Sequence, residues 1–195
     1  MRDLGRSFLV LALATLVLGL AYPALVTGIS AVAFSHQANG SLIERDGKVV
    51  GSRLAAQAFT NPRYFHARPS ATTPPYNAGG TTFSNLGPTN SELAKQVRQR
   101  AQAILKLERP YNPGLTAGQI PVDAVTTSGS GIDPDISPAY ARLQARRVAA
   151  VRHLSLATAE RLVREHTDGR SLGFFGEPGV NVLELNLALD RLGRS

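Results

Sequence analysis

The chain has 195 residues, no cysteine and a formal net charge of +7 at pH 7. Without cysteine, a disulfide framework and a thiolate metal site are excluded. The positive charge favours anionic partners or membrane lipid head groups, although a basic surface can also serve solubility alone. Aromatic residues are few and are not interleaved with basic ones, so the sequence gives no indication of a nucleic-acid partner.

Residues 8–34 form a long apolar segment without a charged side chain. An α-helix needs roughly 20 residues to cross the core of a bilayer, where the backbone finds no other hydrogen-bond partner. The segment therefore predicts one transmembrane helix, with a kink at Pro23. The alternative is a cleaved signal peptide with Ala31-Val32-Ala33 as its cleavage site, but the apolar core of such a peptide is typically only about 7–15 residues long.

Basic residues flank this segment on one side. Arg2 and Arg6 precede it, and the next basic residue, Arg45, lies well beyond its end. The excess of positive charge before a span indicates a cytoplasmic N-terminus. We therefore expect a cytoplasmic segment 1–7, a transmembrane helix 8–34 and an extracytoplasmic soluble domain 35–195.

The sequence after the apolar segment predicts a single soluble α+β domain. Asp46-Gly47 between short apolar runs predicts a β-hairpin over residues 42–50. A short helix is expected over 53–59 and a strand over 64–68. Residues 70–88 are rich in Pro, Gly, Thr and Asn, and a loop of this length inside a compact domain is usually functional or disordered.

A long helix follows this loop. Thr89 and Glu92 fit a capping box at its start, and an apolar stripe from Leu93 to Leu105 marks its buried face. Residues 121–126 have the composition of a short strand.

Two further helices begin at capping residues, Ser137 and Ser155. The tail, 181–190, alternates like a strand but has the composition of a helix, and we favour a helix.

Within the helix after Ser137, the polar pair Gln144 and Arg147 falls on the inner face, whereas Arg152 points away. A buried polar pair must be hydrogen-bonded. We expect Arg147 to bond loop carbonyl groups and to tie down the Ser128–Gly131 loop, with a ligand or partner contact as the alternative.

The Ser128–Gly131 loop is the main candidate for chemistry. Its Ser-Gly-Ser-Gly sequence is similar to a phosphate-binding nest, but a turn is favoured because no P-loop pattern is present. Neither Ser128 nor Ser130 has the spacing of a nucleophile elbow, and the sequence does not place His66 near them as a base. The histidines show no paired metal-ligand spacing, so no metal site is predicted.

Several short motifs, each weak alone, occur here in the order typical of one family. The chain resembles the C subunits of Kdp-type potassium-transporting ATPases over nearly its whole length. The motifs are Tyr22-Pro23, Pro62-Arg63-Tyr64-Phe65-His66, Arg68-Pro69-Ser70-Ala71, Tyr76-Asn77, Ser84-Asn85-Leu86-Gly87-Pro88, Ser128-Gly129-Ser130-Gly131, Ile136-Ser137-Pro138 and Val180-Asn181-Val182.

This resemblance implies a non-catalytic accessory subunit in the bacterial inner (plasma) membrane, part of an ATP-driven, high-affinity potassium uptake complex. Its partners would be a channel-like potassium-selective subunit and a P-type ATPase subunit. It would assemble the complex and act as a catalytic chaperone that raises the ATP affinity of the ATPase subunit. The chain would have no cofactor of its own, and ATP would reach it through the ATPase subunit.

The family motif associated with nucleotide contact is a Ser-Gly-Gly-Ser-Asn run after Tyr-Asn. Here the glycines are separated from the serine and asparagine. The candidate nucleotide or partner contacts are Tyr76, Asn77, Gly79, Gly80, Ser84, Asn85, Ser128, Gly129 and Ser130. An extracytoplasmic body would have to influence ATP binding through the span, whereas the opposite topology would allow direct contact. Two other classes remain open: a tethered extracytoplasmic hydrolase using Ser128 or Ser130, and a stand-alone binding module.

Overall fold

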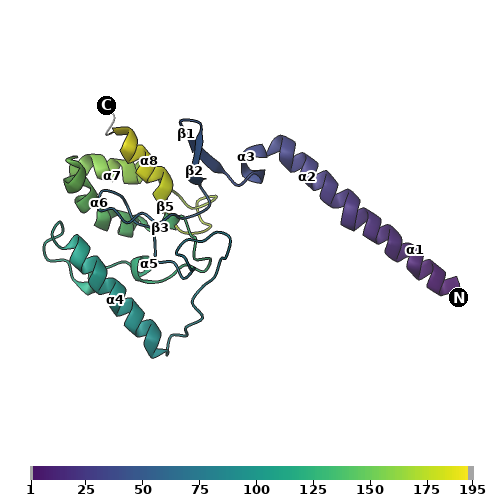
Figure 1. Cartoon of the computed structure of the whole chain (residues 1–195), viewed down its shortest axis with the longest axis horizontal. Coiled ribbons are helices and arrows are strands. Elements are labelled where there is room, and N and C mark those ends of the chain that lie inside the picture. The colour runs from purple at the N-terminus through teal and green to yellow at the C-terminus, as the bar shows by residue number, and fades with distance from the viewer. Residues whose placement is uncertain (1, 193–195) are drawn as a thin grey trace. The chain divides into compact units, whose positions relative to one another are not determined.

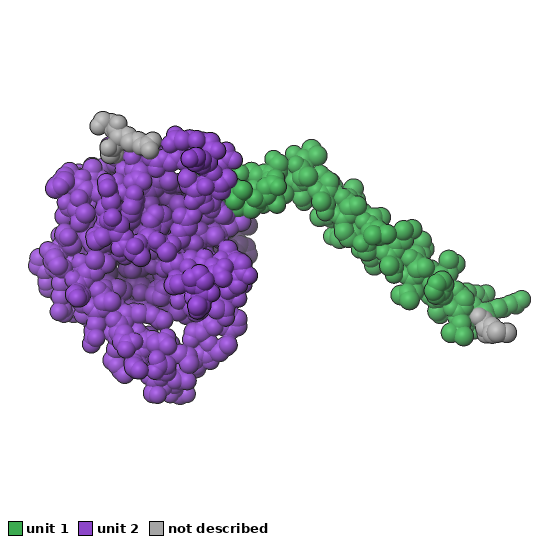
Figure 2. Space-filling model, viewed as in Figure 1, with its two compact units in different colours: residues 1–43 green, residues 44–195 purple. Residues whose placement is uncertain are grey.

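A computed structural model describes residues 2–192. The chain divides into two compact units, Met1–Ile43 and Glu44–Ser195 (Figure 2). The first unit is mostly one helix, Arg2–Ala33, of 32 residues, which by length and composition could cross a membrane. The second unit combines helices with short strands (Figure 1). The predicted α+β class, with one N-terminal apolar helix, is confirmed.

The long helix has three parts, α1 (Arg2–Leu16), a π-helical turn η1 (Val17–Ala21) and α2 (Tyr22–Ala33). Pro23 has no amide hydrogen to donate to the carbonyl group of Gly19, four residues earlier. The π-helical turn covers Gly19, and such turns are a common cause of irregularity in helices. A short helix α3 (Ser35–Ala38) follows.

The predicted hairpin is confirmed. Strands β1 (Leu42–Arg45) and β2 (Lys48–Ser52) form a two-stranded sheet. Asp46 and Gly47 both have positive φ angles, 53° and 72°, as a two-residue hairpin turn requires.

The next two predictions were wrong. Residues 53–59 form a turn and an irregular segment in place of a helix, and 64–68 do not form a strand. The amide of Ala56 donates to the distant carbonyl of Ile132 at 2.8 Å, so it is not available to a local helix. The backbone of Phe65 and His66 bonds to side chains, which takes the place of a neighbouring strand.

Helix α4 (Ser91–Glu108) begins two residues after Thr89. Its cap is Asn90, whose Oδ1 accepts a hydrogen bond from the amide of Glu92 at 2.8 Å, so the predicted capping box of Thr89 and Glu92 was wrong. A short 3-10 turn, η2 (Ala117–Gln119), follows.

Helix α5 (Val122–Val125) replaces the strand expected over 121–126. The helical turn directs the Asp123 carboxylate to the amide and the hydroxyl of Ser137, at 2.7 and 2.9 Å. These bonds connect α5 to the start of the next helix.

The C-terminal part contains the remaining elements. Strand β5 (Gly179–Asn181) lies between β3 (Asp135–Ile136) and β4 (Thr167–Asp168) in a three-stranded antiparallel sheet. Ser137 and Ser155 cap α6 (Pro138–Arg152) and α7 (Leu156–Glu165), as predicted.

The tail forms helix α8 (Val182–Leu192), which confirms the helical assignment. Helices α6, α7 and α8 lie together at one end of the second unit, with α4 beneath them in this view (Figure 1). Alanines make the close approach of α6 and α7 possible, because Ala145 of α6 and Ala159 of α7 are completely buried. Leu185 and Leu189 of α8 are buried in the same core.

A buried polar network that fixes an irregular segment

An ion pair lies at the centre of the second unit. Nε of Arg147, on α6, donates to Oε1 of Glu108, the last residue of α4, at 2.8 Å. The two side chains are 0% and 2% exposed. Arginine remains charged at any ordinary pH, so the network around it has to supply acceptors.

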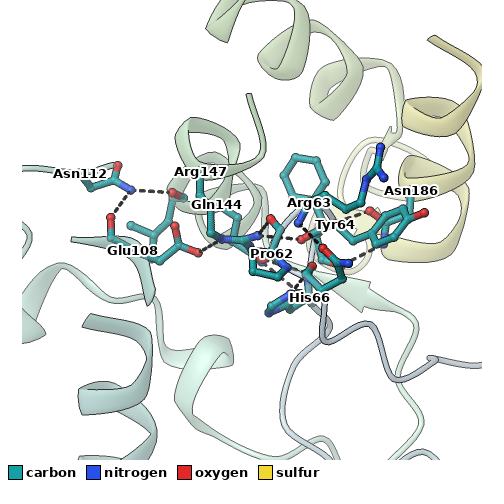
Figure 3. Close-up of polar contacts among 12 residues, drawn as sticks. Pro62, Arg63, Tyr64, His66, Glu108, Asn112, Gln144, Arg147 and Asn186 are labelled. Carbon is teal, nitrogen blue, oxygen red and sulfur yellow. Dashed lines mark hydrogen bonds and ion pairs between the residues drawn. The ribbon is translucent and has the colours of Figure 1, made fainter. Parts of the chain in front are cut away.

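The remaining donors of Arg147 reach the backbone of an irregular segment and the side chain of Gln144. Nη1 donates to the carbonyl groups of Pro62 and Tyr64, the latter at 3.0 Å, and Nη2 donates to Oε1 of Gln144 at 2.9 Å (Figure 3). The guanidinium therefore joins α4, α6 and residues 62–64.

Two amide side chains take the place of a strand partner for the same segment. Gln144 accepts from the amide of His66 at 2.8 Å and donates to its carbonyl at 3.1 Å. Asn186, on α8, bonds Phe65 in the same two-way manner, at 2.8 and 2.9 Å. Buried backbone groups need such partners, and here side chains from two helices provide them.

A second ion pair continues the network toward the surface. Asp190 accepts from Nη2 of Arg152 at 2.7 Å and from the hydroxyl of Tyr64 at 3.1 Å. Nε of Arg152 also donates to the carbonyl of Arg63 at 2.7 Å. The side chain of Arg152 is only 4% exposed, so the expectation that it points away from the core was wrong. It turns inward because it donates to three acceptors, the Asp190 carboxylate and the carbonyl groups of Arg63 and Leu189.

The pKa values of Glu108 and Asp190 are shifted in opposite directions. Burial raises the pKa of Glu108, and the attraction of Arg147 and the hydrogen bond from it offset this only in part. Burial also acts on Asp190, but hydrogen bonds from Arg152, Tyr64 and Arg45 outweigh it and lower the pKa of Asp190. Burial, together with the nearby charge of Arg147, lowers the pKa of His66.

The Ser128–Gly131 loop is held elsewhere, so the expectation that Arg147 ties it down was wrong. The amide of Ser128 donates to the carbonyl of Pro69 at 3.4 Å, and the hydroxyl of Ser70 donates to the carbonyl of Gly131 at 2.6 Å. Gly131 has a φ of +74°, and a Cβ there would lie 2.6 Å from Cγ2 of Thr72. The close approach requires glycine.

The structure brings some of the candidate contact residues to this loop. The amide of Tyr76 donates to Ser70 Oγ at 3.0 Å, and the amide of Asn77 donates to Thr72 Oγ1 at 3.0 Å. Gly79 and Gly80 lie against the side chain of Asn77. These residues and Ser128–Gly131 thus share Ser70 and Thr72 as supports.

The other two candidates are not connected to this support. The hydroxyl of Ser84 accepts from the amide of Leu86 at 3.4 Å, within its own turn. Asn85 is exposed beside it. The hydrogen bonds of the described residues therefore leave Ser84 and Asn85 apart from the loop pair.

The hydrogen bonds of the Ser128–Gly131 loop favour a turn-forming role for its serines over catalysis or anion binding. The hydroxyls of Ser128 and Ser130 accept from the amides of Gly131 and Ile132, at 2.7 and 3.2 Å. The amides of Ser128, Gly131 and the adjoining Ile132 are thus already engaged, whereas an anion nest needs free ones. The ring of His66 lies 3.1 Å from the carbonyl of Asn61. Within residues 2–192, no group of three His, Asp or Glu side chains suited to a metal is present.

Three network residues were missed in the sequence: Glu108, Asn186 and Asp190. A signal was present for two of them. Glu108 follows Ile104 by four residues and so continues the buried stripe of α4, and Asn186 lies between the buried Leu185 and Leu189. A polar residue in such a stripe indicates a buried hydrogen-bonding role.

Comparison with known proteins identifies the family. The family model described as "KdpC: K+-transporting ATPase, c chain" matches residues 4–191. A potassium-transporting ATPase KdpC subunit from Methylococcus capsulatus is 56% identical over 187 residues, which are 95% of this chain and 96% of the relative. KdpC subunits from Gemmatimonas aurantiaca and Mycobacterium tuberculosis are 51% and 50% identical, each covering 98% of this chain and 94% and 99% of the relative. The chain therefore belongs to the family of C chains of K+-transporting ATPases.

Proposed function

We propose that this protein is an accessory, non-catalytic subunit of an ATP-driven potassium uptake complex. The observation that carries the proposal is the family match over residues 4–191, which includes both the apolar helix and the soluble body. The proposed partners are a channel-like potassium-selective subunit and a P-type ATPase subunit. The role is assembly of the complex and support of high-affinity uptake.

The site geometry supports a structural role. Four polar side chains, those of Asn186, Gln144, Arg147 and Arg152, bond the backbone of residues 62–66 and so fix the position of this irregular segment. A rigidly held irregular segment suits recognition of a partner, because little conformational entropy is then lost on binding. Pro62 and Arg63 are the exposed residues of this segment, and Arg63 is a candidate partner contact.

The finer proposal concerns ATP. By family resemblance, the subunit acts as a catalytic chaperone that raises the ATP affinity of the ATPase subunit. We place the N-terminus in the cytoplasm and the body outside, on the basis of Arg2 and Arg6 before the span. In this topology ATP is not contacted directly, and the influence on ATP affinity passes through the span and the partner subunits.

The functional test is purification of the complex in mild detergent with and without this chain. If the proposal is right, the tagged chain brings out both larger membrane subunits, and a complex prepared without it has a higher KM for ATP in potassium-stimulated hydrolysis. Recovery of the chain without partners would support a stand-alone binding module. An unchanged KM would contradict the chaperone role, and recovery of the two larger subunits as a stable complex without this chain would contradict the assembly role.

A further inference from the structure

The strongest unexplained surface feature is a hairpin tip, residues 171–176. Three large apolar side chains protrude from it, Leu172, Phe174 and Phe175, which are 83%, 64% and 58% exposed. In the rest of the second unit, the described exposed large hydrophobics are separated from one another in sequence: Val49, Leu54, Phe83, Val122 and Leu192. Single exposed apolar residues are normal, whereas a contiguous apolar group marks an interaction site.

The tip has a defined conformation. Ser171 and Phe175 exchange two backbone hydrogen bonds of 2.9 Å, and the rings of Phe174 and Phe175 are 4.2 Å apart. Leu172 adopts a φ of +54°, which a leucine seldom does outside a tight turn that imposes it. The backbone thus holds a leucine in an unfavourable conformation that keeps its side chain in solvent, which is typical of functional loops.

The charges around the tip are paired. Arg170 and Glu177, which flank it, bond at 2.7 and 2.9 Å. Asp168 bonds Arg53 at 2.7 Å. No charged residue occurs from Ser171 to Gly176. Burial of the tip in an apolar medium would therefore not require burial of an unpaired charge.

The linker between the two units limits how far the body can lie from a bilayer that the helix crosses. Eight residues, 34–41, separate the apolar helix ending at Ala33 from strand β1 beginning at Leu42. Fully extended, they reach at most about 28 Å. If the helix crosses the membrane, the body cannot leave the membrane surface, whichever side it occupies.

We infer that the tip formed by Leu172, Phe174 and Phe175 inserts into the lipid head-group and acyl-chain boundary as a second membrane contact of the body. Leucine and phenylalanine are the side chains that interfacial segments bury about 5–10 Å into this boundary. A bilayer is the favoured occupant because the tether holds it within reach and because the net positive charge of the chain attracts anionic lipids. The inference goes beyond the proposed function and holds for either topology.

The absence of tryptophan from the sequence permits a direct test. Phe174→Trp and, separately, Phe175→Trp are prepared in the full chain and reconstituted into phosphatidylethanolamine–phosphatidylglycerol vesicles with brominated acyl chains. Phe83→Trp is the matched control, because Phe83 is 56% exposed and lies outside the tip. We expect blue-shifted emission and strong bromine quenching at 174 and 175 and neither at 83.

A further variant separates insertion from mere proximity. Leu172→Asn, combined with Phe175→Trp, removes apolar surface while asparagine tolerates the positive φ, and should reduce the quenching. The inference would be overturned if the tryptophans at 174 and 175 showed the same red-shifted emission and the same lack of quenching as the control at 83. A blue shift that arises only in the assembled complex and without bromine quenching would also overturn it, because the tip would then occupy an apolar pocket of a partner subunit.

Discussion

The guanidinium of Arg147 and the carboxylate of Glu108 meet at 2.8 Å with almost no exposure to solvent. Glu108 ends α4 and Arg147 is in the middle of α6, so the pair fixes the end of one helix against another. The same guanidinium bonds the carbonyl groups of Pro62 and Tyr64. The pair is thus the point at which an irregular surface segment is joined to the helical core.

Replacing Arg147 should strongly destabilise the folded chain. Arg147→Met leaves the Glu108 carboxylate buried without its partner and two carbonyl groups without donors, which costs about 3–5 kcal/mol. Urea unfolding of the full chain in mild detergent measures this loss. Arg98→Met, at an exposed position of α4, is the control and should change the free energy of unfolding by less than about 0.5 kcal/mol. Equal effects of both substitutions would contradict the network.

The pair should also show strong coupling. In Arg147→Met combined with Glu108→Leu, neither charge remains buried, so the double variant should be destabilised by less than the sum of the two single variants. We expect a coupling free energy of about 1–3 kcal/mol from the double-mutant cycle. Additive losses would mean that the two residues stabilise the fold independently.

A substitution of Asn186 tests whether side chains replace the hydrogen bonds of a neighbouring strand. Asn186→Leu retains the volume but leaves the amide and carbonyl of Phe65 unpaired in the core. A loss of about 1–3 kcal/mol for each buried unpaired group is expected. Gln102→Leu, on the exposed side of α4, is the matched control. A stable Asn186→Leu protein would show that the backbone of Phe65 finds other partners.

The two carboxylates should give opposite pH dependences. The pKa of Asp190 is lowered below 3.8, so its contribution to stability is present above pH 3.8 and is lost as the pH falls through the folded-state pKa. The stability difference between the native chain and Asp190→Asn should therefore shrink in acid.

For Glu108 the sign is reversed. Its pKa is raised above 4.5, so the folded state binds the proton more tightly than the unfolded state does. Relative to Glu108→Gln, the native chain should gain stability as the pH falls from the raised pKa toward 4.5. Urea unfolding at a series of pH values checks both trends, and parallel trends in the two comparisons would contradict the assignment.

The serines of the Ser128–Gly131 loop should be dispensable for activity. Ser128→Ala removes the 2.7 Å bond to the amide of Gly131 and should cost about 1 kcal/mol of stability. Ser128→Ala combined with Ser130→Ala should leave potassium-stimulated ATP hydrolysis by the complex nearly unchanged. Loss of a separate hydrolytic activity in this variant, with assembly intact, would favour the hydrolase alternative.

Local signals in the sequence were sufficient for much of the fold. The Asp46-Gly47 hairpin and the helices capped by Ser137 and Ser155 follow from residues close in sequence, and so does the apolar helix. The inner-face position of Gln144 and Arg147 follows from helical periodicity. Such features depend on spacing along one element, which the sequence displays directly.

Two of the errors share a physical cause. Residues 64–68 have the composition of a strand, but Gln144 and Asn186, far away in sequence, supply the hydrogen bonds that a strand partner would make. Arg152 turns inward because Asp190 and the carbonyl of Arg63 lie beneath it. These contacts join distant parts of the chain, so periodicity within one helix does not reveal them.

The most direct test of the central claim, that the body acts from outside the cytoplasm and does not contact ATP, is its accessibility in intact cells. Because the chain has no cysteine, Thr82→Cys in the exposed loop gives a single site for a membrane-impermeant thiol reagent, and Ser7→Cys before the span is the control. We expect labelling at position 82 in intact cells and labelling at position 7 only after lysis. The reverse pattern would place the body in the cytoplasm and contradict this account, because Gly79, Gly80, Ser84 and Asn85 would then be accessible to ATP.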